Sequence, residues 1–363
     1  MKTDFHMLEI AELRRETPDA TSFGLAVPTG LVDAFRFKPG QHIAVRARID
    51  GEEVRRTYSI TSAPGDRLLW ITIKRVGDGV FSSWAHDALT AGKSLDCMEP
   101  AGRFILPRED TSGAARRIIA IAAGSGITPV ACIIEYALAQ SPGTNVTLLY
   151  GNRTVEDIIF RERLEGLKNR HIDRLQILHV LSRDSEADVP LLAGRIDADK
   201  ITRLGPALRI TPHDDILLCG PDTLIKAGRD AVLKLGADRK RIHFEYFKAG
   251  PQTAERRSQA RATTASVTPA ANVEVVAILD GMRRTFAVRD GEHIVDAALA
   301  AGIRVPYSCK GGMCCTCRAK LVEGHVVMDR NFSLQDWEME AGFVLTCQSR
   351  PTTQRIVLDY DAA

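Results

Sequence analysis

The chain has 363 residues, and its 48 basic and 46 acidic side chains give a formal net charge of +2. This length predicts two or three domains, and so balanced a charge gives no support for a nucleic-acid-binding protein. The N-terminus lacks the apolar stretch of a signal peptide, and no apolar run is long enough to span a membrane. We therefore expect a soluble, cytoplasmic protein that binds neither nucleic acid nor membrane.

Residues 1–112 are predicted to form an antiparallel β-barrel. Short segments in which apolar and polar residues alternate run from Gln41 to Ile49, from Val54 to Ile60 and from Leu68 to Ile73. Glycine and proline separate them, as expected of strands joined by turns.

The barrel segments carry a pattern typical of flavin sites. Arg56-Thr57-Tyr58-Ser59 is an R-x-Y-S sequence, in which the Arg binds a phosphate, the Tyr ring covers the isoalloxazine and the Ser hydroxyl lies near flavin N5. A helix is predicted to begin at Gly79, so that its N-terminal amides face a pyrophosphate. The alternative is a solvated arginine beside a tyrosine that packs in the barrel. The candidate flavin ligands are Arg56, Thr57, Tyr58, Ser59, Lys74, Val76, Gly79 and Ser82.

From residue 113 to 248 the pattern changes to strand, glycine turn and helix. The apolar segment 117–123 leads into Gly124-Ser125-Gly126, and a helix is predicted from Ile127 to Ala139. Further apolar segments at 145–150, 175–181, 214–219 and 241–246 complete five parallel strands of an α/β domain.

Candidate nucleotide ligands follow the carboxyl ends of these strands, where α/β sheets bind nucleotides. They are Gly124, Ser125, Gly126, Thr128, Pro129, Asn152, Arg153, Ser182, Arg183, Cys219, Gly220 and Pro221, and Glu245 ends the fifth strand. Arg153 and Arg183 suit a 2'-phosphate and no acidic residue is evident beside them, so NADPH is favoured over NADH. Two surface arginines without a ligand are the alternative.

Residues 249–272 are poor in large apolar side chains and rich in Ala, Thr, Ser and Arg, which predicts a linker. A separate domain follows at 273–363. Within it, 273–279 and 283–288 form a predicted hairpin across Asp280-Gly281, and a short helix is predicted from His293 to Ala301.

Four cysteines in this last domain have the plant-type spacing for a [2Fe-2S] cluster: C-x4-C-x2-C and then a distant fourth. They are Cys309, Cys314, Cys317 and Cys347. A zinc site or disulfides are the alternatives, although zinc sites usually show paired C-x2-C motifs and the cytosol disfavours disulfides. Ligation by Cys315 would give spacings of x5 and x1, so we interpret it as a non-ligand thiol. In so small a domain the cluster completes the core, and iron loss is expected to unfold it.

Together, Arg56-Thr57-Tyr58-Ser59, the sequence 124–129, Cys219-Gly220-Pro221 and the C-terminal cysteine motif resemble the ferredoxin-NADP reductase superfamily fused to its own plant-type ferredoxin. The resemblance covers nearly the whole chain. It implies a multidomain protein with an antiparallel β-barrel FAD domain, an α/β NAD(P) domain and an α+β ferredoxin domain of the β-grasp type. The cofactors implied are FAD, a [2Fe-2S] cluster and NADPH as electron donor.

Within that superfamily the chain is most similar to reductase subunits of bacterial phenylacetyl-CoA epoxidase complexes. The similarity rests on residues 5–8 and 16–20, on Tyr150-Gly151-Asn152-Arg153-Thr154, and on the C-terminal position of the ferredoxin domain. It implies a di-iron oxygenase partner and a role in phenylacetate catabolism. Phthalate-oxygenase-type reductases share the domain order but hold FMN, so a reductase of a Rieske-type oxygenase is the alternative partner assignment.

The electron count gives the expected mechanism. A nicotinamide delivers two electrons as hydride and the cluster accepts one, so a flavin must stand between them. The predicted catalytic residues are Ser59 near flavin N5, Tyr58 over the ring, and Cys219 and Glu245 lining the nicotinamide pocket. A redox-sensing flavin and iron-sulfur module without rapid electron flux is the alternative of another class.

Overall fold

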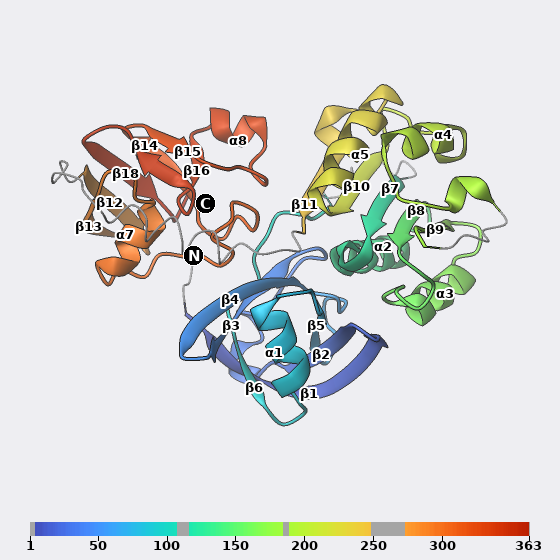
Figure 1. The fold of residues 1–363 in the computed structure, drawn as a ribbon, viewed down its shortest axis with the longest axis horizontal. Helices are drawn as coiled ribbons and strands as arrows, with labels where there is room; N and C mark the ends of the chain where they lie inside the picture. The colour runs from blue at the N-terminus through green and yellow to red at the C-terminus, as the bar shows by residue number, and fades with distance from the viewer. Residues whose placement is uncertain (1–3, 107–115, 184–188, 248–272, 363) are drawn as a thin grey trace.

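The computed structural model describes residues 4–106, 116–183, 189–247 and 273–362. Figure 1 shows three bodies: a barrel from the N-terminal part, an α/β unit from the middle and a smaller unit from the C-terminal part. The predicted linker 249–272 and the boundaries predicted near residues 112 and 248 lie outside the described residues.

The barrel is a six-stranded antiparallel sheet in the order β4-β3-β6-β1-β2-β5. A bridge between Ile60 and Ile71 joins the two edges. The β3–β4 hairpin turns at Asp50-Gly51, whose positive φ angles of 51° and 81° fit a two-residue type I′ turn. The elements are β1 (His6–Thr17), β2 (Ala20–Ala26), the 3₁₀ turn η1 (Thr29–Leu31), β3 (His42–Ile49), β4 (Glu52–Ser59), β5 (Leu69–Lys74), α1 (Val80–Ala88) and β6 (Ser94–Cys97).

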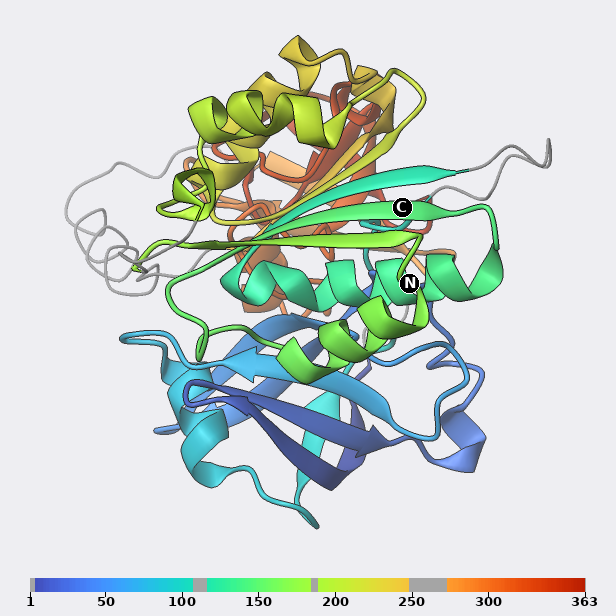
Figure 2. The ribbon, with the colours of Figure 1, turned by 90° about the vertical axis from the view of Figure 1, so that its right-hand side faces the viewer.

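The α/β unit is a five-stranded sheet in the order β11-β10-β7-β8-β9, and every neighbouring pair is parallel. Figure 2 shows helices on both faces of this sheet, with α2 and α3 on the face toward the barrel. The elements are β7 (Arg117–Ala123), η2 (Gly124–Gly126), α2 (Ile127–Gln140), β8 (Asn145–Asn152), α3 (Arg161–Arg170), β9 (Leu175–Leu181), η3 (Pro190–Leu192), α4 (Ala198–Leu208), β10 (Asp215–Gly220), α5 (Asp222–Lys234), η4 (Arg239–Arg241) and β11 (Ile242–Tyr246).

The C-terminal unit is a mixed sheet in the order β13-β12-β18-β14-β16, in which only the central β12–β18 pair is parallel. Its first hairpin turns at Asp280-Gly281, as predicted, with φ angles of 51° and 72°. The elements are β12 (Val273–Leu279), β13 (Met282–Val288), α7 (Ile294–Ala300), β14 (Arg318–Glu323), β15 (Val326–Met328), α8 (Asp336–Glu340), β16 (Phe343–Leu345), β17 (Ser349–Pro351) and β18 (Arg355–Asp359).

The three units pack against one another. Ala20 and Phe104 of the barrel belong to the apolar core that covers the α2 face of the parallel sheet. Met313 and Phe332 of the C-terminal unit pack against the core on the other face. These contacts confirm the predicted fold class and place the cysteine loop beside the other two units.

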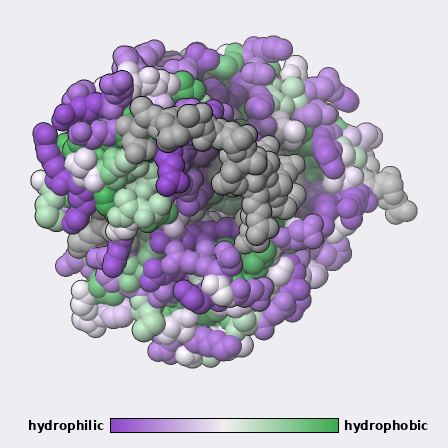
Figure 3. Space-filling model, turned by 60° about the vertical axis from the view of Figure 1, so that its left-hand side comes forward, coloured by the Kyte–Doolittle hydropathy of each residue, from purple (hydrophilic) through white to green (hydrophobic). Residues whose placement is uncertain are grey.

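The surface seen in Figure 3 is largely hydrophilic, with small hydrophobic patches between the charged side chains. In the described ranges, no helix combines the length and the apolar character that crossing a membrane requires.

Candidate functional site: a cavity shared by three domains

A cavity of about 680 Å³ lies where the three units meet. Most of the residues predicted to bind flavin or nucleotide line it, together with two of the predicted cluster ligands. These are Arg56, Thr57, Tyr58, Ser59, Lys74, Val76, Gly79, Ser82, Gly124, Ser125, Thr128, Asn152, Arg153, Ser182, Arg183, Gly220, Pro221, Glu245, Cys309 and Cys314. Residues from opposite ends of the chain therefore face one space.

The barrel side of the cavity is built by β4 and the start of α1. Tyr58 packs against Phe81 of α1 with ring centroids 5.8 Å apart, and burial raises the pKa of its phenol, which stays neutral. Gly79 leaves no room for a side chain, because a Cβ there would lie 2.4 Å from Ser82 Oγ and 2.5 Å from Val76. The chain thus passes tightly into α1, and Gly79, Phe81 and Ser82 at its start line the cavity, where the N-terminus of a helix suits a pyrophosphate.

The inner end of the cavity contains a buried histidine and carboxylate that face each other. His42 Nδ1 lies 3.5 Å from Glu245 Oε1, and the two side chains are 3% and 13% exposed. In the part of the chain that the structure describes, both ring nitrogens of His42 and Glu245 Oε2 lack a hydrogen-bond partner. Buried polar atoms without a partner are costly, which fits a wall built to contact a polar ring.

The nucleotide side begins at the turn after β7. Gly124 has a φ of 51°, and a Cβ there would meet no atom within 4 Å, so its backbone is open to a ligand. Gly126 has a different role, because a Cβ there would lie 2.2 Å from the carbonyl oxygen of Cys219. Thr128 Oγ1 donates to the Ser125 carbonyl at 3.0 Å and fixes the turn.

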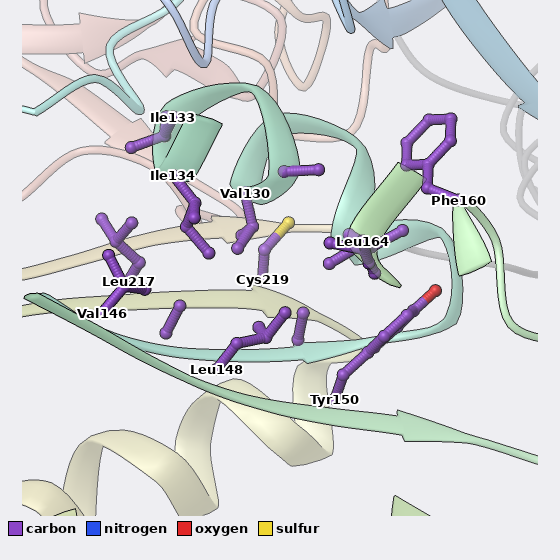
Figure 4. Packing of buried hydrophobic residues seen from close by; sticks show 14 of the residues in the cluster. Val130, Ile133, Ile134, Val146, Leu148, Tyr150, Phe160, Leu164, Leu217 and Cys219 are labelled. Atoms are coloured by element: carbon purple, nitrogen blue, oxygen red, sulfur yellow. The ribbon is translucent and has the colours of Figure 1, made fainter. Parts of the chain in front are cut away.

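Three of the residues predicted for the flavin and nucleotide sites do not line the cavity: Gly126, Pro129 and Cys219. The Cys219 side chain is 0% exposed and belongs to the core between β10 and α2. Figure 4 shows it among apolar side chains that include Val130 and Ile134. Burial, and then the charge of Glu245, raise the pKa of this thiol. The Cys219 side chain does not line the cavity, although its register partner Glu245 on β11 does, and the role of Cys219 at the nicotinamide stays a prediction.

The arginines of the nucleotide side differ in their partners. Arg153 is held by Asp157 and by Asp19, whose Oδ2 lies 2.9 Å from Nη2, so the expectation of no nearby acidic residue is wrong. Arg183 and Arg195 also line the cavity and are exposed. Among the described residues neither guanidinium is in an ion pair or side-chain hydrogen bond. Within the described ranges, Arg183 and Arg195 are therefore the unpaired guanidinium groups of this wall.

The four predicted cluster ligands gather as two pairs. Hydrogen bonds join the Cys314 thiol to Cys309 and the Cys317 thiol to Cys347. Donation from Cys314, together with loop amides such as Gly311 N at 3.3 Å, lowers the pKa of Cys309 to about 5. No three metal-binding side chains of the described ranges converge on the position of one ion. Two pairs suit a two-iron cluster, in which each iron takes two thiolates.

Cys315 is separate from these pairs. It has a φ of 56°, and burial raises the pKa of its thiol to about 12. Its side chain packs at the edge of the ferredoxin core.

Several contacts hold the cysteine-bearing unit over the cavity. Thr57 Oγ1 and Ser308 Oγ are 2.8 Å apart, and the ring of Tyr246 packs at a tilt of 58° against that of Phe332, with 5.4 Å between ring centroids. Arg103, after the barrel, forms an ion pair with the buried Glu338 of α8.

Comparisons with known proteins agree with this arrangement. Three family models match: an oxidoreductase FAD-binding domain at residues 8–105, an oxidoreductase NAD-binding domain at 120–230 and a 2Fe-2S iron-sulfur cluster binding domain at 277–352. One subunit of the 1,2-phenylacetyl-CoA epoxidase of Escherichia coli K12 is 40% identical over 99% of both chains. The chain belongs to the ferredoxin-NADP reductase superfamily. It is a reductase with FAD, NAD(P)H and [2Fe-2S] domains.

Other members of this superfamily are more distant. The ferredoxin reductase component of a Mycobacterium tuberculosis 3-ketosteroid-9-alpha-monooxygenase is 33% identical over 98% of this reductase and 95% of its own length. Among solved structures, phthalate dioxygenase reductase matches over 98% of both chains, with a TM-score of 0.57 and 23% identity. A type IV self-sufficient cytochrome P450 has a TM-score of 0.68 and 22% identity, and the match covers 98% of this chain and 41% of the P450. These two structures share the fold.

Sequence reasoning missed part of the site. His42, Phe81, Arg195 and Met313 line the cavity and were not predicted. A signal existed only for His42, which begins a strand one residue after the turn at Pro39-Gly40. Arg195 lies in a segment without a periodic pattern, so its sequence context gave no sign that the fold would bring it to the cavity.

Proposed function

We propose that the reductase takes hydride from NADPH and supplies single electrons to a di-iron oxygenase, the epoxidase that acts on phenylacetyl-CoA. The observation that carries the electron route is the shared cavity, which residues of the flavin, nucleotide and cysteine motifs line together. The 40% identity to a component of the Escherichia coli epoxidase over 99% of both chains supports the choice of partner.

The residues present fit the three groups. Arg56 and the amides that follow Gly79 would hold the FAD phosphates, and Tyr58 would cover the isoalloxazine. Ser59 and the His42–Glu245 pair would contact its reactive edge and the nicotinamide. When bound, the flavin accepts two electrons and releases them singly to the cluster held by the two cysteine pairs.

The wall formed by Arg183 and Arg195 supports NADPH as the donor. A 2'-phosphate carries the charge that distinguishes NADPH from NADH, and arginine binds phosphate with paired, directed hydrogen bonds. Because Arg153 is already paired with Asp157 and Asp19, we assign the 2'-phosphate to Arg183 and Arg195 instead.

The test is an anaerobic NADPH titration of the purified protein, followed by absorbance and electron paramagnetic resonance, with the released flavin identified by chromatography. FAD and a rhombic iron-sulfur signal that appears with NADPH are the expected result. A cluster that stays oxidised would refute the electron route, and slow reduction of artificial acceptors would favour a redox sensor. FMN, or a preference for NADH, would move the reductase toward the phthalate-oxygenase type.

The partner needs its own test. Co-purification of the tagged reductase from its source cells, with metal analysis of the captured oxygenase, is expected to give a di-iron protein without a Rieske cluster. The 33% identity to the ferredoxin reductase component of a 3-ketosteroid-9-alpha-monooxygenase supports an oxygenase other than the epoxidase as second candidate. We take a ring-hydroxylating oxygenase of the Rieske type as that candidate. Capture of an iron-sulfur oxygenase would select that candidate.

A further inference from the structure

The flavin and cysteine motifs meet through one pair of hydroxyl groups. Thr57, next to Tyr58 on β4, has its Oγ1 2.8 Å from the Oγ of Ser308, which directly precedes Cys309. Ser308 is 5% exposed, so water competes little for its hydroxyl. The pair thus joins the strand that bears the flavin residues to the loop that bears the first cluster ligand.

A second contact reinforces the same junction. Arg55, two residues before Thr57, lies with its guanidinium carbon 4.0 Å from the ring centroid of Tyr307. Its Nε donates to Glu53 Oε1 at 2.8 Å, which fixes its direction. Residues i and i+2 of a strand share a face, so Arg55 and Thr57 present one face of β4 to Tyr307 and Ser308.

The cavity shows why this junction matters for electron flow. Cys309 and Cys314 face the space that Tyr58 and Ser59 also line, whereas Cys317 and Cys347 are each 2% exposed and do not line it. With both groups bound, electrons from the barrel side would reach the cluster on the side held by Cys309 and Cys314. The rate of electron transfer falls steeply as the gap between donor and acceptor widens, so whatever fixes the Cys309 loop against β4 controls that step.

We propose that Ser308 is a positioning residue for electron transfer from flavin to cluster, acting through its hydrogen bond to Thr57. One electron passes at a time from the reduced flavin to the oxidised cluster, and no bond to Ser308 forms or breaks. The inference rests on the electron route of the proposed function. It adds that the neutral hydroxyl pair of Thr57 and Ser308 fixes the distance between flavin and cluster. Neither hydroxyl is a predicted cluster ligand or covers the flavin ring.

The test uses the full-length protein with both cofactors in anaerobic stopped flow, which separates flavin reduction by NADPH from the subsequent reduction of the cluster. Ser308→Ala is expected to leave flavin reduction unchanged and to slow cluster reduction about fivefold, the factor that corresponds to one net hydrogen bond. Ser308→Thr retains a hydroxyl and is expected to restore the rate. Ser333→Ala is the matched control, because Ser333 Oγ donates to Gly312 O of the same loop at 3.2 Å and, among the described residues, forms no hydrogen bond to β4.

Two further readouts separate positioning from other effects. Amide hydrogen exchange of residues 52–59 is expected to rise in Ser308→Ala and in Thr57→Val, and no further in the double variant, because both changes remove one bond. The reduction potential of the cluster is expected to stay unchanged. Cluster reduction at the wild-type rate in Ser308→Ala, an equal slowing in Ser333→Ala, or a shifted cluster potential would each overturn the proposal. A wild-type protein whose cluster NADPH does not reduce would instead refute the proposed function.

Discussion

Gly126 offers a sharp test of how the nucleotide turn is built. Its backbone φ is −62°, which alanine adopts easily, so Gly126→Ala adds a steric conflict and no backbone strain. The new Cβ would lie 2.2 Å from the Cys219 carbonyl oxygen, 2.6 Å from its carbon and 2.9 Å from Gly220 N. These are backbone atoms of β10, which is hydrogen-bonded to β7 and β11 on its two sides, so they yield little. We expect a cost of about 3 kcal/mol, at the upper end for overpacking.

The matched control is Gly124→Ala. Gly124 has a φ of 51° but open space around it, so the variant costs about 1 kcal/mol of backbone strain and creates no clash. In thermal unfolding, Gly126→Ala is expected to lower the Tm by roughly 10 °C, and Gly124→Ala by about a third of that. NADP⁺ affinity should fall in Gly126→Ala, because β10 yields little and the clash must instead shift the turn that carries Gly124 and Ser125, which line the cavity. A Gly126→Ala protein as stable as wild type would refute this account of the turn.

Three further predictions concern the ferredoxin domain and the α/β domain. Arg103→Ala should weaken the docking of the ferredoxin domain on the barrel domain by about 1 kcal/mol, because Arg103 is partly exposed and Glu338 retains its ion pair with Arg318. Unchanged amide hydrogen exchange in α8 would contradict this prediction. Iron chelation should unfold residues 273–362, and an unchanged circular dichroism spectrum would show that the cluster is dispensable for folding. Burial lowers the pKa of His179, so its neutral form stabilises the fold and this contribution is lost as the pH falls below 6.5. In His179→Phe the urea concentration at the unfolding midpoint should therefore change less between pH 7 and pH 5 than in the wild type. An equal change in the two proteins would refute the assignment.

The sequence was informative where chemistry fixes residue type and spacing. The cluster ligands were readable because two irons need four thiolates at set intervals, and the parallel strands because their apolar runs are continuous. The same continuity hid the burial of the Cys219 side chain, because a strand buried on both faces gives no alternation to show which side chains reach the cavity. The pairing of Arg153 with Asp19 was unreadable for another reason, since 134 positions separate the two residues.

The sharing of one cavity by three domains of one chain also affects kinetics. When a ferredoxin is a separate protein, its reduction is a collision whose rate follows its concentration. Here the Cys309 loop is tethered to the same polypeptide as Tyr58 and already contacts the β4 strand. The effective concentration of the cluster at the flavin is therefore set by the chain itself. Dilution of the protein should leave the internal electron transfer unchanged, and only delivery to the oxygenase should depend on how much reductase is present.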